Sequence, residues 1–135
     1  MQHSLPGIRA ISYLPCSLLA PHIIEKYRAG LPIAVFSPST PIEHYGDASC
    51  IAESEYTNGG YYEKTTLSCT TTDTIPQSVP IAFVVTDVAD HSFLIGCREA
   101  PIPIVEITKQ IDKESNIFEV KVTFQREKSL IECSV

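Results

Sequence analysis

Hydrophobic and polar residues alternate along much of the chain with a period of two, which is typical of β-strands buried on one face. The segment "IFEVKVTFQ", residues 117–125, shows this alternation most clearly. Its apolar face holds Phe118, Val120, Val122 and Phe124. Residues 8–14 and 41–45 alternate in the same way. The pattern therefore predicts a strand at each of these three segments.

Two β-prone segments, residues 49–57 and 61–72, flank the turn sequence Asn58-Gly59-Gly60. Asn-Gly between two such runs is the strongest short-range signal for a β-hairpin. Charged residues lie on both sides of the turn. We therefore expect a long hairpin whose tip is exposed to solvent.

The segment "IAFVVT", residues 81–86, is apolar without alternation, which predicts a strand buried on both faces. A polar turn follows, and residues 92–97, "SFLIGC", return as a second strand. Gly96 in that strand indicates a bulge or a close approach of another backbone. We expect these two strands to form the central hairpin of the core.

The remaining segments are shorter. Residues 32–36 and 130–135 are predicted as short strands, 73–80 as a loop and 112–116 as a polar turn. Pro101 and Pro103 cannot donate to a sheet ladder, so residues 98–108 are expected at a sheet edge until about Ile104. The single helical candidate is residues 21–29, with Pro21 in its first turn and Gly30 as its stop.

These elements predict an all-β fold, mainly an antiparallel barrel or sandwich, with one short helix near the N-terminus. The 135 residues are enough for one domain with a core, so residues 1–135 are expected to form a single β-rich domain. Strand order is not determined by these patterns.

The charge and hydropathy of the chain exclude several classes of partner. There are 10 Lys and Arg against 16 Asp and Glu, a net charge of −6, so a nucleic acid is not an expected partner. No apolar run approaches the ~20 residues of a membrane span.

The first 24 residues lack the features of a secretory signal, and Pro15 argues against a lipoprotein Cys16. We therefore expect a cytoplasmic protein.

The five cysteines are Cys16, Cys50, Cys69, Cys97 and Cys133. None forms a C-x-x-C pair, so neither a zinc knuckle nor a thioredoxin-like redox motif is present. In a reducing compartment they are expected to be small core residues. A disulfide pair or a metal site remains the alternative.

Motifs of enzymes are missing from the sequence, which holds no glycine-rich phosphate loop, no H-E-x-x-H and no G-x-S-x-G. His44, Asp47 and Cys50 have a spacing that could pair an imidazole with a thiol, although a loop histidine beside a core cysteine is the commoner arrangement. We therefore expect no catalytic residue, no cofactor and no small-molecule substrate.

Asp87, Asp90 and His91 share the turn of the predicted central hairpin. Carboxylates in turns usually accept hydrogen bonds from their own backbone, whereas a calcium site needs more oxygen ligands. We therefore expect no metal site.

Aromatic residues gather around the predicted hairpin tip. Tyr56, Asn58, Tyr61 and Tyr62 are the candidate residues for protein interaction. Tyrosines there can form a binding surface for a protein or a sugar, and packing between the two strands is the structural alternative.

The run "FVVTDVADHSFLIGCREAPIP", with "ISYLP" near the start and "VTF" and "SLIEC" near the end, resembles small β-rich tail and neck proteins of Bacteroidales prophages. The resemblance covers most of the chain, although this chain has Ala89-Asp90 where the family pattern often has a glycine. It implies a non-enzymatic virion assembly protein, in the cytoplasm or the virion, that contacts copies of itself and other assembly proteins. The alternative is a β-sandwich binding module for a carbohydrate or protein ligand.

Overall fold

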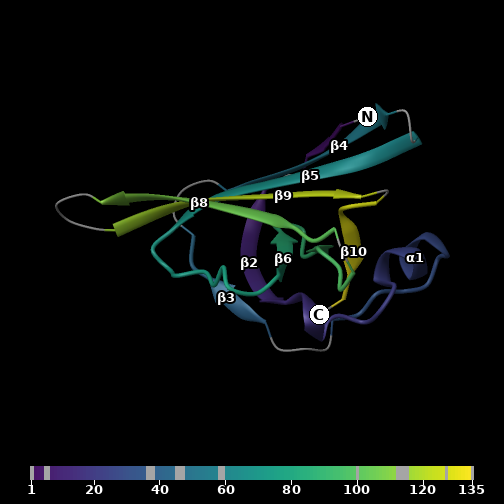
Figure 1. Cartoon of the computed structure of the whole chain (residues 1–135), viewed down its shortest axis with the longest axis horizontal. Coiled ribbons are helices and arrows are strands. Elements are labelled where there is room, and N and C mark those ends of the chain that lie inside the picture. The colour runs from purple at the N-terminus through teal and green to yellow at the C-terminus, as the bar shows by residue number, and fades with distance from the viewer. Residues whose placement is uncertain are drawn as a thin grey trace.

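The computed structural model describes all of the chain except residues 1, 5–6, 36–38, 45–47, 58–59, 100, 112–115, 127 and 135. The described residues form ten β-strands in two five-stranded sheets, with one short α-helix and one 3-10 turn (Figure 1). Sheet A joins β1 (Gln2–Ser4), β4 (Ser49–Thr57), β5 (Gly60–Thr71), β9 (Asn116–Arg126) and β8 (Ile104–Ile111), in this spatial order.

Sheet B joins β10 (Ile131–Cys133), β7 (Ser92–Ile95), β6 (Ile81–Asp87), β2 (Ile8–Pro15) and β3 (Thr40–Ile42), again in spatial order. Neighbouring strands within both sheets are antiparallel. The two sheets form the layers of a sandwich-like fold (Figure 1). The predicted all-β class is confirmed.

The core lies between the two sheets and follows the predicted periodicity. In β9, Val120, Val122 and Phe124 are at most 2% exposed, whereas the alternating Lys121 is exposed. In β6, residues 81–85 are all buried, as predicted for a strand without a polar face. The β6–β7 pair lies at the centre of sheet B, as expected for the central hairpin.

The helix α1 spans Ile23–Arg28 and is preceded by a 3-10 turn at Cys16–Leu18. It is shorter at each end than the predicted 21–29. Gly30 adopts a φ of +83° and donates its N–H to the Tyr27 carbonyl, which ends the helix as predicted. Within the described residues, no helix has the length and apolar character needed to cross a membrane.

One local prediction was wrong, one strand was not predicted, and one predicted turn is mostly untested. The strand prediction at 32–36 was wrong for its described part, because Ala34 forms only an isolated bridge with Ser134. The flanking Ile33 and Val35 are buried there, so the apolar run reflects burial without a strand ladder. The three-residue strand β1 was not predicted, since it is too short to show a period. The predicted turn at 112–116 falls mostly outside the described residues.

The three longest strands belong to sheet A, namely β4, β5 and β9. The β5 strand has 12 residues and β9 has 11, against 7 in β6 and 4 in β7. At about 3.4 Å per residue, β5 is about 41 Å long and β6 about 24 Å. Sheet A therefore extends beyond sheet B, and Figure 1 shows the β4–β5 and β8–β9 hairpins projecting at opposite ends.

All five cysteines are buried free thiols, in agreement with the expected core role. Burial raises the pKa of Cys50 to about 12 and the pKa of Cys69 to about 11. These thiols are therefore protonated near neutral pH and poor nucleophiles.

Gly96 lies where β7 approaches β6 closely, as the sequence predicts. A Cβ at Gly96 would lie 2.6 Å from the Cβ of Ala82, and its φ is +135°. We expect Gly96→Ala to lower the free energy of unfolding by at least about 2 kcal/mol, because it adds a steric clash to backbone strain. Urea denaturation measures the change.

The matched control is Gly30→Ala, which also has a positive φ but has no atom within 4 Å of the added Cβ. It is expected to cost about 1 kcal/mol from the backbone alone. Equal losses in the two variants would contradict the role of the close approach to Ala82.

Candidate functional site

Two tyrosines face each other near the end of the β4–β5 hairpin. Tyr56 and Tyr61 are directly opposite in the strand register, and their ring centroids lie 5.0 Å apart in an edge-to-face arrangement. Such a contact stabilises the hairpin by about 0.5–1.5 kcal/mol. The two residues nevertheless remain 72% and 74% exposed. Cross-strand packing is therefore present, and it leaves most of both rings in contact with water.

The structure does not place all the predicted interaction residues on one face. Tyr62 follows Tyr61 directly in β5, so its side chain points to the opposite face of sheet A, where it is half-buried. Asn58 lies outside the described residues. Of the four candidates, the structure thus brings together Tyr56 and Tyr61.

A recess lies next to the tyrosine pair, on the same face of the hairpin and farther from its tip. Ser54 and Glu63 form the next cross-strand pair on the same face, and Ala52 and Thr65 the next, which is buried. The recess has a volume of about 260 Å³. It is lined on the hairpin side by Ala52, Ser54 and Glu63, and across from them by Tyr27, Phe93, Lys128, Leu130 and Glu132. We call this recess, together with Tyr56 and Tyr61, the hairpin surface.

A carboxylate at the recess holds the chain that leads into β10. Glu63 Oε1 accepts the backbone N–H groups of Ser129 and Leu130 at 2.9 and 2.8 Å. Lys128 Nζ donates to Glu63 Oε2 at 3.2 Å. Burial acts to raise the pKa of Glu63, but the two N–H groups and Lys128 outweigh it, so the pKa lies below its usual value.

The spacing of His44, Asp47 and Cys50 in the sequence allows a pair of an imidazole and a thiol. His44 forms a bridge with Thr71, whereas Cys50 pairs with Leu67, four residues away along β5. Their backbones are therefore roughly 13 Å apart along that strand. Asp47 lies outside the described residues. The structure does not bring this imidazole and this thiol together.

In the turn between β6 and β7, the buried carboxylate of Asp87 accepts hydrogen bonds from the backbone of the turn itself. Asp87 Oδ1 accepts the N–H groups of Ala89 and His91, each at 2.9 Å. Asp90 adopts a φ of +65° and lies on the surface, where it pairs with Arg9. The expectation that carboxylates in this turn accept hydrogen bonds from their own backbone is therefore confirmed for Asp87.

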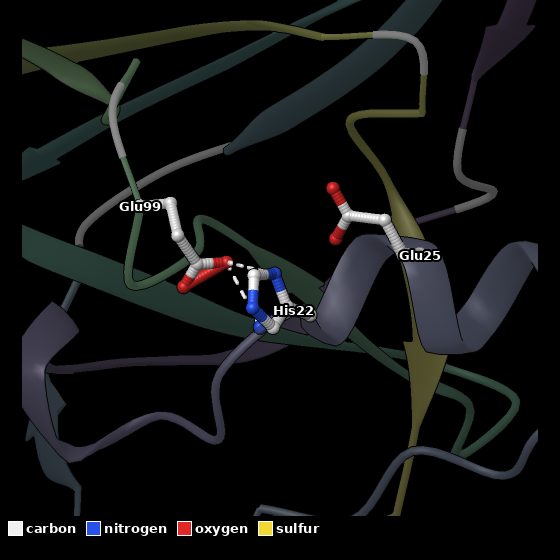
Figure 2. Close-up of side chains that lie close together, drawn as sticks. All are labelled: His22, Glu25 and Glu99. Carbon is white, nitrogen blue, oxygen red and sulfur yellow. Dashed lines mark hydrogen bonds and ion pairs between the residues drawn. The ribbon is translucent and has the colours of Figure 1, made fainter.

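A second polar cluster, which the sequence analysis missed, lies beside α1. It holds His22, Glu25 and Glu99, and Figure 2 shows the Glu99 carboxylate turned toward His22 with Glu25 projecting from the helix beside them. The three-residue spacing of His22 and Glu25 is visible in the sequence. Glu99 is 77 residues from His22 and carries no local signal of this proximity.

The hydrogen bonds of Glu63 make the stability of the fold depend on pH. We expect Glu63→Gln to lower the free energy of unfolding by about 1–3 kcal/mol at pH 7, because a neutral amide cannot accept the same charge-assisted bonds. The folded-state pKa lies below the usual 4.5. The carboxylate's contribution is therefore complete above the unfolded-state pKa and is lost as the pH falls through the folded-state pKa.

Chemical denaturation of both proteins between pH 7 and pH 3 measures this difference. The control is Glu106→Gln on the exposed outer face of β8, which should change stability by less than about 0.5 kcal/mol. A stability difference between wild type and Glu63→Gln that stays constant to pH 3 would contradict the assignment.

No protein-family model matches the chain, and neither a curated protein nor a solved structure matches it.

Proposed function

We propose that this chain is a non-enzymatic assembly protein that acts through protein–protein contacts of its hairpin surface, first of all with copies of itself. The observation that carries the proposal is the exposed Tyr56–Tyr61 pair on a hairpin that extends past sheet B. Apart from the contact between their two rings, these tyrosines are exposed and contribute little to the packing of the fold.

The chemistry of the hairpin surface suits a protein partner. Tyrosine is enriched at interfaces and among the residues that dominate binding energy, because it presents a large, rigid ring with a polar end. The adjacent recess combines the apolar Phe93 and Leu130 with the charged Glu63 and Lys128. It can therefore receive a partner's side chain while the tyrosine rings cover the surrounding surface.

The edge of sheet A provides a second element for assembly. The β8 strand is an edge strand, and Ile104 at its start is 61% exposed. An edge strand can pair with a strand of a neighbouring subunit. The same strand carries two exposed charged residues, Glu106 and Lys109. Such charges disfavour pairing with an arbitrary strand, so the strand of a partner would need charges complementary to them.

A virion component is the specific form of the proposal. It rests on the resemblance of the sequence to tail and neck proteins of prophages, which implies a homo-oligomer within a larger assembly. The separation of His44 from Cys50 and the raised pKa of the buried thiols support a role without catalysis.

A binding module for a polar ligand such as a carbohydrate is the second candidate. A hollow of about 320 Å³ lies on the outer face of sheet A, over β4, β5, β9 and β8. Ser49, Ser68, Lys121 and Glu106 are neighbours in one cross-strand row along it. Hydroxyl and charged groups in a shallow row favour a polar ligand.

Light scattering of the native protein over a range of concentration tests the assembly proposal. Wild type is expected to form a discrete oligomer, and Tyr56→Ser/Tyr61→Ser to raise its dissociation constant at least about thirtyfold, as for loss of a dominant interface contact. Added salt should strengthen assembly, because each copy carries a net charge of −6.

Two controls make the test specific. Val88→Ser removes another exposed apolar side chain, which is 63% exposed, from the β6–β7 turn and should leave the mass unchanged. Tyr62→Ser changes the opposite face of the same hairpin and should have a small effect. A wild-type protein that is monomeric at every concentration and salt would contradict self-assembly and favour the binding module.

A further inference from the structure

We propose that the hairpin surface is complementary to itself: two copies of the chain pack hairpin against hairpin about a twofold axis, and the Tyr56–Tyr61 pair of each copy enters the recess of the other. The inference rests on the assembly function proposed above and specifies the symmetry and the contacts of the first interface. It starts from the position of the tyrosine pair beside the recess, on one face of one hairpin.

The tyrosine pair and the recess are neighbours along the same two strands. Tyr56 and Tyr61 form one cross-strand pair, and Ser54 and Glu63, which line the recess, form the next pair on that face. Two residues along a strand span about 7 Å. A twofold axis that runs across the strands between the two pairs therefore exchanges them. Each tyrosine pair then faces the recess of the other copy, which makes the interface isologous.

The shape of this end of the molecule allows such packing. The β4–β5 hairpin projects past sheet B, and the far side of the recess forms a wall at the start of the projection (Figure 1). Thr65 and Leu67, farther along the same face of β5, are buried, whereas Tyr61 is 74% exposed. The hairpin of a second copy can therefore cover this face where sheet B ends. Two packed sheets lie about 10 Å apart, so their side chains interdigitate.

The size and lining of the recess suit a tyrosine side chain. Its volume of about 260 Å³ is below the roughly 300–1,000 Å³ of pockets for drug-sized ligands. Phe93 and Leu130 provide apolar contacts for a ring. Glu132 and Lys128 provide polar partners for a hydroxyl. A tyrosine has both an apolar ring and a polar end, so it matches this lining.

Electrostatics favour the exchange over a contact of recess with recess. Each copy carries a net charge of −6, so two copies repel each other unless their contact is neutral or paired. In the recess, the charge of Glu63 is paired with Lys128 at 3.2 Å, which leaves the carboxylate of Glu132. A neutral tyrosine can donate its hydroxyl to that carboxylate. Two recesses face to face would instead bring the carboxylates of both copies together.

The tyrosine contacts supply much of the area that a stable interface needs. Tyr56 and Tyr61 are 72% and 74% exposed, so full cover of the four rings of two copies removes about 400–700 Å² from water. The surfaces that receive the rings lose a comparable area. The total of about 800–1,400 Å² reaches the lower end of specific interfaces, at about 1,200 Å².

An isologous contact closes after two copies. A larger assembly therefore needs a second surface on each dimer. The β8 strand forms an edge of sheet A away from the β4–β5 hairpin, with β9 between β8 and β5. It remains available for that purpose when the hairpins are paired.

Mixing two variants tests the exchange of tyrosines and recesses. Tyr56→Ser/Tyr61→Ser keeps the recess and removes the rings, whereas Ser54→Trp keeps the rings and fills the recess. Ser54 is exposed and tryptophan is favoured in strands, so the fold is retained. Each variant alone should have a dissociation constant at least about thirtyfold above that of wild type. The mixed dimer regains one of two equal contacts, so its dissociation constant should lie about fivefold below that of either variant.

Sedimentation equilibrium of each variant and of their equimolar mixture measures these constants, and native mass spectrometry identifies the mixed dimer. Glu53→Trp, at an exposed position on the opposite face of the same strand, is the matched control and should assemble as wild type does. The exchange is overturned if Ser54→Trp assembles as wild type does, or if the mixture is no tighter than the variants alone. Wild type that assembles without this recovery contradicts the exchange alone, whereas a monomeric wild type contradicts the assembly function as well.

Discussion

Burial of one face of each sheet against the other is the constraint on which the rest of this structure depends. Antiparallel strands alternate their side chains, so a five-stranded sheet with one apolar face is stable only when that face is covered. Sheet B covers the middle of sheet A and no more, because β6 and β7 are much shorter than β5 and β9. The projecting hairpins follow from this difference in length.

Two carboxylates, the partly buried Glu63 and the buried Asp87, hold loops of this sandwich in place. Glu63 binds the segment that enters β10, and Asp87 binds the turn between β6 and β7. In both cases the carboxylate accepts backbone N–H groups that the strands do not pair. The charge is thereby stabilised in a partly buried place, and two loops gain fixed positions. Glu99 accepts one such bond and keeps one oxygen unpaired, which is why it differs from the other two.

The hairpin surface and the cluster of His22, Glu25 and Glu99 lie at the same end of the molecule. Tyr27 of α1 lines the recess, and Glu25 of the same helix belongs to that cluster. Arg126, beside that cluster, is the register partner of Glu63 in the recess. The hydrogen bond from the His22 N–H to Glu99 therefore ties the start of α1, which forms one wall of the recess, to the connection between β7 and β8.

The sequence by itself determined the local elements: the alternation of 117–125, the hairpin at 49–72 and the close approach at Gly96 follow from side-chain period, turn chemistry and glycine. Tyr56 and Tyr61 could likewise be named from the hairpin alone. Only the tertiary structure decided which strands are neighbours, and that Glu99 meets His22 across 77 residues. The physical reason is that periodicity records which side of a segment is buried, whereas pairing between distant segments depends on how all buried faces are covered together.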